Sequence, residues 1–321
     1  MERRTVIITG ANSGIGKAAA HKFAIEGYCV IMACRNIDIS KKVQKEIVEA
    51  TNNEHVELMR IDMSSFNSIR KFCEEFKSNY EKLDILIHNA AYFNHGEKKY
   101  QLSTDNVEVT FATNTFGPLL MTKLLENHLA KSDDPRILHA CTNNIRHFFN
   151  PKRKIEFDNL RGEYKETRRY SVYKNYGDSK MALLMLTFKM AQVYKEKDIK
   201  VNAIEITGAK MSKETIQKVT PKWRVIARVQ NLFFPSPDHT ANIYFDICTA
   251  TEYKNVTGKL IGSKKNILRP ALTNNPGLIT EVKQLFGSEF YPFYATNHDV
   301  IQKVWMLSNE LVEESEIRSP S

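Results

Sequence analysis

Residues 5–17 read Thr5-Val-Ile-Ile-Thr9-Gly10-Ala-Asn-Ser-Gly14-Ile-Gly16-Lys17, an apolar run followed by a glycine-rich turn and the start of a helical pattern. This order predicts a strand, a tight loop and a helix. The glycines let backbone N–H groups and the positive end of the helix approach a pyrophosphate. Glycines also serve purely structural turns, and the spacing differs from G-x-G-x-x-G. The position in the first strand–helix unit favours a dinucleotide site made by Gly10, Asn12, Ser13, Gly14, Ile15 and Gly16.

The rest of the chain repeats this alternation of short apolar runs and segments of helical period. Strands are predicted at residues 5–9, 28–34, 56–61, 83–88, 136–141 and 200–206, and helices at 15–27, 39–51, 65–80, 109–131 and from 176 onward. The pattern is typical of α/β proteins with a doubly wound parallel sheet. Because no linker or repeat interrupts it, one domain is predicted over residues 1–262. Residues 263–321 are predicted to pack on that domain as an irregular extension with a last helix near 298–313.

The composition is that of a globular protein, with 42% hydrophobic residues and a net charge of +9. Part of this charge lies in a basic insertion at about residues 150–174, which we interpret as a solvated loop because no nucleic-acid motif accompanies it. The five cysteines lack disulfide or metal spacing, and no metal site is expected. No apolar run is long enough for a membrane span or a signal peptide, so a cytoplasmic protein is expected.

The end of the second predicted strand indicates which dinucleotide is bound. An NAD-binding protein would place Asp or Glu there to accept from the ribose 2′-hydroxyl, whereas this chain has Arg35. A guanidinium can pair with a 2′-phosphate, which favours NADP(H), and Lys17 is a second candidate. Alternatively, Arg35 stacks on the adenine or faces solvent. At the end of the third strand, Asp62, next to Met63, can accept from the adenine amino group or can be an ordinary helix N-cap.

The candidate reaction centre is Tyr176-Gly-Asp-Ser-Lys180, which opens a predicted amphipathic helix. The spacing places the phenol and the ammonium one turn apart on the same helix face. A phenol has an ordinary pKa of about 10, and a neighbouring ammonium favours the phenolate. The pair can then donate a proton to a carbonyl or accept one from an alcohol. Tyr170 and Lys174 have the same spacing, but they fall in the charged insertion and not in the long helix.

Further motifs accompany these two. They are residues 9–16 (Thr-Gly-Ala-Asn-Ser-Gly-Ile-Gly), 32–35 (Met-Ala-Cys-Arg), 88–91 (His-Asn-Ala-Ala), 114–122 (Asn-Thr-Phe-Gly-Pro-Leu-Leu-Met-Thr) and 176–180. In this order they resemble the short-chain dehydrogenase/reductase (SDR) family, particularly its retinol dehydrogenase-like branch. The resemblance covers residues 5 to about 262 and implies a Rossmann fold that interconverts alcohols and carbonyl compounds. Residues 89–92, 158–162 and 176–180 also look like the light-dependent protochlorophyllide reductases, which keeps that chemistry open.

The resemblance also implies roles for individual residues. Asn89, Ala90 and Ala91 would line the cofactor, with alanine where the family usually has glycine. Asn114 matches a helix residue whose backbone carbonyl holds a water linking the lysine to solvent; a buried polar bridge between helices is the other interpretation. Thr142 stands where the family has its catalytic serine. Its hydroxyl can donate to the substrate oxygen, although the extra methyl restricts χ1.

Two more features bear on the site. Thr207-Gly208 replaces the family's Pro-Gly after the sixth strand, and Ser212 falls at the position that usually contacts the nicotinamide amide. The insertion between Thr142 and Tyr176 is expected to form one wall of the substrate cleft.

The leading hypothesis is therefore an NADP(H)-dependent oxidoreductase. Tyr176 would be the general acid, Lys180 would hold the nicotinamide ribose and lower the pKa of the phenol, Thr142 would orient the substrate, and Asn114 would complete the proton relay. The apolar stretch 223–235 suggests an apolar substrate, or only core and lid packing. A cofactor-binding sensor or scaffold without turnover is the alternative, supported by Thr142 and Thr207. Family members often form dimers through helices that correspond to 109–131 and 176–194, unless the tail blocks that contact.

Overall fold

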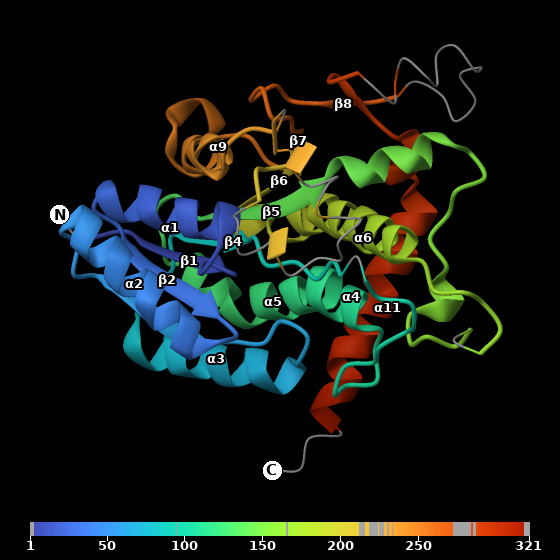
Figure 1. Ribbon diagram of the computed structural model, residues 1–321, viewed down its shortest axis with the longest axis horizontal. Helices are drawn as coiled ribbons and strands as arrows, with labels where there is room; N and C mark the ends of the chain where they lie inside the picture. The colour runs from blue at the N-terminus through green and yellow to red at the C-terminus, as the bar shows by residue number, and fades with distance from the viewer. Residues whose placement is uncertain are drawn as a thin grey trace.

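A seven-stranded parallel sheet forms the centre of the molecule, in the order β3-β2-β1-β4-β5-β6-β7 (Figure 1). The strands are β1 (Thr5–Thr9), β2 (Cys29–Cys34), β3 (Val56–Arg60), β4 (Ile85–His88), β5 (Arg136–Thr142), β6 (Lys200–Ile206) and β7 (Leu260–Ile261). The computed structural model describes residues 3–94, 96–164, 166–211, 216–217, 224, 228–229, 231–232, 234–271, 284 and 287–317, with side chains to residue 314. The strand order reverses between β1 and β4, which is where sheets of this kind bind ligands.

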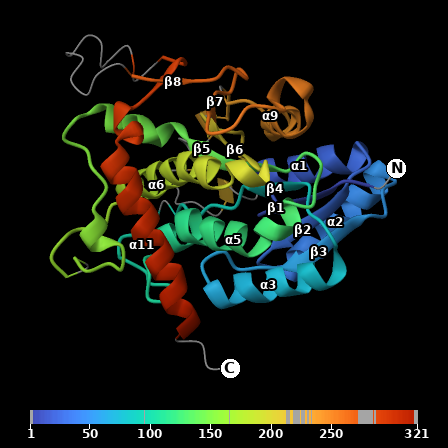
Figure 2. The same cartoon turned by 180° about the vertical axis from the view of Figure 1, so that it is seen from behind.

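Helices cover both faces of the sheet, as predicted. On one face lie α1 (Gly14–Ile25), α2 (Ile37–Thr51) and α9 (Pro237–Thr249), and on the other lie α3 (Phe66–Asn79), α5 (Gly117–Leu129) and α6 (Val172–Val193) (Figures 1 and 2). Successive residues of β1 are buried on opposite faces, Val6 and Ile8 in one core and Ile7 in the other. This period of two on strands whose faces are both covered explains their continuous apolar sequence. The predicted doubly wound α/β fold is confirmed.

Several elements differ from the sequence-based expectation. The predicted helix at 109–131 is divided into α4 (Val109–Phe111), a π-helical turn (Ala112–Phe116) and α5. Pro118, in the first turn of α5, has no N–H to continue the preceding hydrogen-bond ladder. Helix α6 begins at Val172, one turn before Tyr176, because the Ser171 side chain caps it.

Strand β7 of the sheet and helix α9, which packs on one face of it, were not predicted. Strand β7 has only two residues, which is too short to give a pattern. Helix α9 has a recognisable start, since Ser236 is its N-cap and Pro237 occupies the first turn.

The C-terminal part of the chain packs on the same core as α5 and α6. A short pair, β8 (Arg269–Pro270) and β9 (Phe290–Tyr291), precedes α11 (His298–Ile317), which crosses the ends of α5 and α6 (Figure 2). Val304 and Val312 of α11 are buried in that core, and Lys123 of α5 reaches Asn309 at 2.7 Å. No helix among the described residues is both long and apolar enough to span a membrane.

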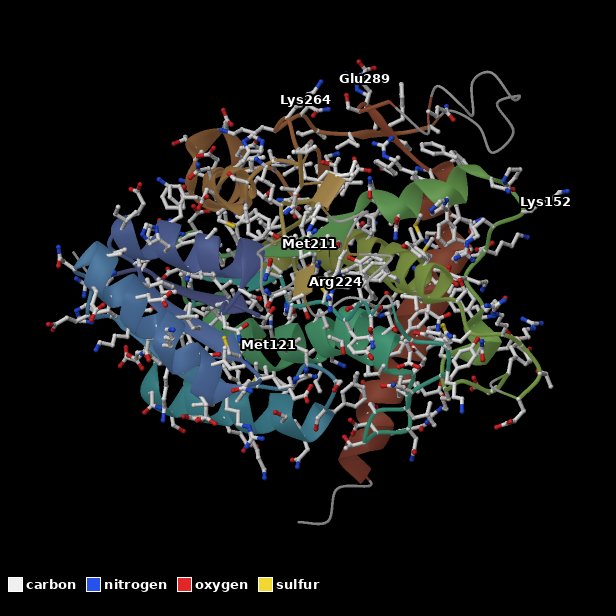
Figure 3. All side chains as sticks on the ribbon, viewed as in Figure 1. Met121, Lys152, Met211, Arg224, Lys264 and Glu289 are labelled. Atoms are coloured by element: carbon white, nitrogen blue, oxygen red, sulfur yellow. The ribbon has the colours of Figure 1, made fainter. Side chains whose placement is uncertain are left out.

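The basic insertion is bound to the protein more closely than a solvated loop would be. Its Arg153 pairs with Asp178, a residue of α6 that is 2% exposed. Lys174 pairs with Glu156 at 2.8 Å and Arg168 pairs with the same carboxylate at 3.1 Å. Some of its charge nevertheless faces solvent, as Lys152 does at the outer edge (Figure 3). The insertion is therefore exposed in part, as at Arg168, but it is fixed to α6 through the pair between Arg153 and the buried Asp178.

Two buried histidines lie side by side in the sheet. His88 of β4 and His139 of β5 are register partners, with ring centroids 5.1 Å apart. The Thr187 hydroxyl donates to the Leu183 carbonyl, so His139 Nδ1 donates to that hydroxyl at 2.8 Å. Neither His88 Nδ1 nor His139 Nε2 has a hydrogen-bond partner among the described residues. Burial lowers the pKa of both imidazoles, that of His139 to about 3, and the Lys180 ammonium adds to the effect.

These histidines predict acid sensitivity. The unfolded chain protonates His139 below about pH 6.5, whereas the folded protein does so only near pH 3, so this residue lowers the unfolding free energy progressively as the pH falls through that range. The loss is expected to approach ~1.4 kcal/mol per pH unit for one such residue. Urea unfolding of wild type and His139→Asn from pH 7 to pH 4 measures it as a difference in slope. Burial raises the pKa of the Asp178 and Glu108 carboxyls, so these two groups raise the unfolding free energy as the pH falls. They do so in both proteins, so their contribution cancels when the two slopes are subtracted. Equal slopes would contradict the prediction.

Candidate active site

In the loop between β1 and α1, two glycines allow the backbone to pack closely against neighbouring groups. Gly10 has φ of +68°, in the left-handed region that favours glycine. A Cβ on Gly16 would lie 2.2 Å from the Gly10 carbonyl oxygen and 2.5 Å from the Asn89 side-chain nitrogen. Only glycine fits there, so the start of α1 can pack tightly against the loop and the end of β4.

The N-terminus of α1 has the features of an anion-binding site. Ser13 is the N-cap, yet its side chain makes no capping hydrogen bond, and the first turn carries no acidic residue. The first N–H groups of a helix lack intrahelical partners and carry partial positive charge. A phosphate at this position would satisfy them.

A cavity of about 570 Å³ opens beside this loop at the carboxyl ends of the strands. Nine of the predicted cofactor residues line it: Gly10, Asn12, Ser13, Arg35, Asp62, Met63, Asn89, Ala90 and Ala91. Gly14, Ile15 and Gly16 do not line it; they form the first turn of α1 behind the loop. Sequence reasoning missed further lining residues, namely Ala33, Asn36, Ile39, Ile61, Tyr92 and Thr113. Asn36, Ile61 and Tyr92 each adjoin a predicted residue at a strand end, which is the signal that could have found these three.

The two candidate cations for a 2′-phosphate differ in their surroundings. Lys17 is paired with Glu46 of α2 at 2.6 Å, and this pairing lowers the pKa of the Glu46 carboxyl. Arg35 is exposed, lines the cavity directly after β2, and makes no ion pair with a described residue. Arg35 is therefore the cation available to a ligand in the cavity, and Lys17 is already engaged.

Asp62 and Asn89 shape the cavity wall. The Asp62 carboxylate accepts from the N–H and the hydroxyl of Ser64, and Ser65 is the N-cap of α3, so the interpretation of Asp62 as that N-cap is wrong. Asn89 donates to the Thr9 carbonyl at 3.0 Å and accepts from the Tyr244 hydroxyl at 3.2 Å. It thereby ties the ends of β1 and β4 to helix α9.

Tyr176, Thr142 and Lys180 come together at the end of β5. The Thr142 hydroxyl donates to the Asn143 side-chain oxygen at 3.5 Å, accepts from the Asn144 N–H at 3.3 Å, and lies near enough to the Tyr176 phenol to lower its pKa. Lys180 is 1% exposed, and its ammonium donates to the Ala140 carbonyl at 2.7 Å. The structure thus brings together three of the four predicted catalytic side chains, and threonine supplies the hydroxyl where the family has serine.

The electrostatics of this group differ from the expectation in one respect. Burial raises the pKa of Tyr176 to about 12, and the hydrogen bond from Thr142 offsets this only in part. Burial lowers the pKa of Lys180 to about 8. The Lys180 ammonium is not among the causes of this shift, so desolvation of the phenolate raises the phenol pKa in the protein alone, and the lowering by Lys180 stays a prediction. The nearby Cys141 thiol has a pKa raised to about 12 by burial, which argues against thiolate chemistry.

Asn114 lies in the π-helical turn and is fully buried. Its side chain donates to the Ser179 hydroxyl of α6 at 3.1 Å and to the Tyr92 carbonyl at 3.2 Å, and it accepts from the Tyr92 N–H at 2.7 Å. The side chain therefore acts as the buried polar bridge that was one of the two interpretations. π-Helical turns are rare and occur often at functional sites.

The second Tyr-x-x-x-Lys pair does not form a comparable centre. The buried Tyr170 hydroxyl lies 3.3 Å from that of Thr110 and donates to Glu108. Lys174 is engaged by Glu156 and Asp178. The choice of Tyr176 and Lys180 over this pair therefore agrees with the contacts.

The segment after β6 carries the remaining predicted residues. The Thr207 carbonyl accepts from the Asn143 side chain at 3.5 Å. Gly208 has φ of +141°, and a Cβ there would lie 2.8 Å from the Phe234 ring. Neither residue lines the cavity, and Ser212 lies outside the described residues. Met211, near the centre of the view in Figure 3, exchanges two hydrogen bonds of 2.8 Å with the Asn231 side chain.

A cavity at the switch point of a doubly wound sheet is typical of nucleotide-binding proteins, and a Tyr-x-x-x-Lys pair lies on a helix of the same sheet. The family model "short chain dehydrogenase" matches residues 4–147. Human retinol dehydrogenase 13 is 30% identical over 265 residues, which cover 82% of this chain and 77% of the relative. Mouse retinol dehydrogenase 12 is 31% identical over 82% of this chain and 79% of the relative. The chain belongs to the short-chain dehydrogenase/reductase family and is retinol dehydrogenase-like.

Solved structures agree on the fold. A protein from Mycobacterium paratuberculosis superimposes with a TM-score of 0.65 at 22% identity, over 97% of this chain and 93% of that one. A short-chain dehydrogenase of Shigella flexneri, solved in complex with NADP, has a TM-score of 0.61 at 19% identity, over 82% of this chain and 98% of that one.

Proposed function

We propose that this protein is an NADP(H)-dependent oxidoreductase that interconverts an alcohol and a ketone or aldehyde. The observation that carries the proposal is the placement of Tyr176 and Lys180 one helical turn apart on α6, with Thr142 at the end of β5 and the cavity at the same edge of the sheet. The test is NADPH consumption by the purified protein across a panel of aldehydes and ketones, with NADH as the comparison.

The residues that line the cavity fit the adenosine and pyrophosphate parts of NADP(H), whereas Tyr176, Lys180, Thr207 and Gly208, predicted for the nicotinamide end, do not line it. The first turn of α1 and the Gly10 loop would hold the pyrophosphate, and Arg35 would pair with the 2′-phosphate. Asp62 would accept from the adenine amino group, and residues 89–91 would line the ribose and nicotinamide. When bound, the nicotinamide supplies or removes the hydride.

The chain's own side chains handle the proton and the substrate oxygen. In reduction, Tyr176 donates its hydroxyl proton to the substrate oxygen, and Thr142 donates a hydrogen bond that orients it. Tyr176 remains protonated at neutral pH because its pKa is about 12, which suits a proton donor. Lys180, whose pKa is about 8, would hold the ribose and supply positive charge as the phenolate develops. Asn114 fixes α6 against the turn that carries Tyr92, and its backbone carbonyl would complete the proton relay.

Arg35 gives a direct prediction about cofactor choice. Arg35→Ser removes the guanidinium expected to pair with the 2′-phosphate, so the preference for NADPH over NADH in kcat/KM should fall ~30-fold. Lys17→Met is the matched control and should change the preference by less than about threefold, because Lys17 is already paired with Glu46. An unchanged preference in Arg35→Ser would contradict this assignment.

A cofactor-binding protein without turnover is the second candidate. Its support is the raised pKa of Tyr176, which disfavours alcohol oxidation by the protein alone, together with threonine at position 142. Tight NADPH binding with no turnover across the panel would favour it. A basic nucleic-acid-binding role rests on net charge alone and would require steeply salt-dependent binding.

A further inference from the structure

A buried ion pair lies beside the proposed reaction centre, where β5 and β6 end. Arg146 belongs to the 3₁₀ helix Asn143–Phe149, which follows β5 directly, and Glu205 belongs to β6. The Arg146 Nε and Nη2 groups donate to the two oxygens of the Glu205 carboxylate, each at 2.8 Å. Arg146 is 7% exposed and Glu205 is 2% exposed. We call this bidentate contact the Arg146–Glu205 clamp.

The clamp is close to Thr142 both in the sequence and in the sheet. Glu205 is the register partner of Cys141, and the next pair in the register is Thr142 with Ile206. Arg146 comes four residues after Thr142, in the 3₁₀ helix of which Thr142 is the N-cap. The ion pair therefore joins the turn that follows Thr142 to the strand that lies beside it.

The same turn fixes the Thr142 hydroxyl. The hydroxyl oxygen accepts from the Asn144 N–H at 3.3 Å, and Asn144 lies two residues before Arg146. The contact in which this hydroxyl donates, to the Asn143 side-chain oxygen, is 3.5 Å long. A hydrogen bond of that length is weak, so it can be exchanged for one to a substrate oxygen. The position of the Asn144 N–H therefore decides how the Thr142 hydroxyl is oriented.

A buried ion pair is a costly way to hold two segments together. Both charges are taken out of water, and apolar side chains of similar volume often stabilise a fold equally well. The bidentate contact has one property that apolar packing lacks, because two parallel hydrogen bonds fix both the distance and the angle between the groups. In addition, Arg146 Nη1 donates to the Gln284 carbonyl at 2.9 Å, which restrains the guanidinium from a third side. The clamp thus restrains geometry more than it adds stability.

We propose that Arg146 and Glu205 are positioning residues, which hold the turn after β5 so that the Thr142 hydroxyl is directed at the substrate oxygen. The inference rests on the proposed function, because it needs a substrate oxygen between Thr142 and Tyr176. Neither Arg146 nor Glu205 lines the nucleotide cavity, so both act through Thr142 and not through the cofactor. A displacement of ~1 Å at an orienting group can lower a rate ~100-fold.

The test is a double-mutant cycle between the clamp and Thr142, with NADPH oxidation as the readout. In Arg146→Met/Glu205→Met, which removes both charges and so leaves no unpaired ion, kcat should fall ~30-fold while the NADPH Kd stays within about threefold. In a Thr142→Val background the same change should lower kcat by less than about threefold, because the hydroxyl to be positioned is already absent. Equal falls in both backgrounds would mean that the clamp only supports the fold, and would overturn the proposal.

Arg136→Met is the matched control for the loss of a buried arginine. Arg136 is 3% exposed at the opposite end of β5, where it pairs with Asp134 at 2.7 Å and donates to two backbone carbonyls. Its replacement should lower the urea midpoint of unfolding but leave kcat within about twofold. A fall in kcat as large as that of the double variant would show that lost stability is the cause, and would overturn the proposal.

Arg146→Lys provides a second variant in case the double variant does not fold. Lysine keeps the positive charge but cannot make the bidentate contact, so kcat should fall ~5-fold. This fall should disappear in the Thr142→Val background, and its persistence there would contradict the proposal.

If wild type reduces no aldehyde of the panel, the proposed function fails, and hydrogen exchange then decides separately whether the clamp positions Thr142. The Asn144 amide should be protected in wild type by its hydrogen bond to Thr142, and should exchange at least ~10-fold faster in the double variant. Arg136→Met should keep the wild-type rate. An unchanged rate of exchange in the double variant would overturn the proposal.

Discussion

Replacing Tyr176 by phenylalanine is expected to lower kcat for carbonyl reduction about 1,000-fold while leaving the NADPH Kd within about threefold of wild type. The substitution removes only the Tyr176 hydroxyl, which is the proposed proton donor. The ring that packs on Phe93 at 4.4 Å stays, so the fold around it should be retained. Stopped-flow measurement of NADPH oxidation gives the rate, and fluorescence titration gives the Kd.

Tyr170→Phe is the matched control, since it removes the same atom from the competing Tyr-x-x-x-Lys pair. The Tyr170 hydroxyl donates to Glu108 and not to a group at the site, so kcat should change by less than about threefold. A Tyr176→Phe protein that kept more than a tenth of wild-type kcat would require another proton donor.

Gly16→Ala is expected to raise the NADPH Kd at least ~100-fold and to lower the unfolding free energy by about 3 kcal/mol. The new Cβ would lie 2.2 Å from the Gly10 carbonyl oxygen and 2.5 Å from the Asn89 side chain, and the first of these contacts is backbone. The Gly10 loop and the end of β4 must therefore move apart. This movement displaces the backbone N–H groups at the start of α1 that are proposed to bind the pyrophosphate. Urea unfolding and NADPH titration measure the two effects.

Gly177→Ala provides the control for this prediction. Gly177 lies inside α6, and the nearest heavy atom to an added Cβ is the Asn144 carbonyl oxygen at 3.6 Å. Alanine there should leave NADPH binding unchanged and raise stability by up to ~1 kcal/mol through helix propensity. A Gly16→Ala protein with wild-type stability and affinity would show that the loop does not need its close contact.

The fold was largely predictable because its strands are buried on both faces and read as continuous apolar runs. The strand at 200–206 was predicted at its observed bounds, and the glycine loop was predicted between the right strand and helix. Strand β7 was not predictable, because two residues show no period and only pairing with β6 makes them a strand. The π-helical turn depends on tertiary packing around Asn114, so it too has no sequence pattern from which it could be predicted.

At the candidate site, motif spacing predicted residues but could not predict their contacts. Lys17 was a second candidate beside Arg35 for the 2′-phosphate, and its pairing with Glu46, 29 residues away, could not be predicted from the sequence. The sign of the Tyr176 pKa shift depends on burial, which a Tyr-x-x-x-Lys spacing does not report. The packing of the Phe93 ring on the Tyr176 ring joins residues far apart in the sequence, so no local pattern could reveal it.

The central claim is that this chain transfers a hydride between NADP(H) and a carbonyl carbon. The most direct test is single-turnover reduction of the aldehyde panel with each C4-deuterated NADPH epimer in turn, followed by mass analysis of the alcohols. The account predicts one deuterium on the carbinol carbon with one of the two epimers, and none with Tyr176→Phe on the same time scale. Saturating NADPH binding with no deuterated alcohol from any aldehyde would contradict it and leave a nucleotide-binding protein without this chemistry.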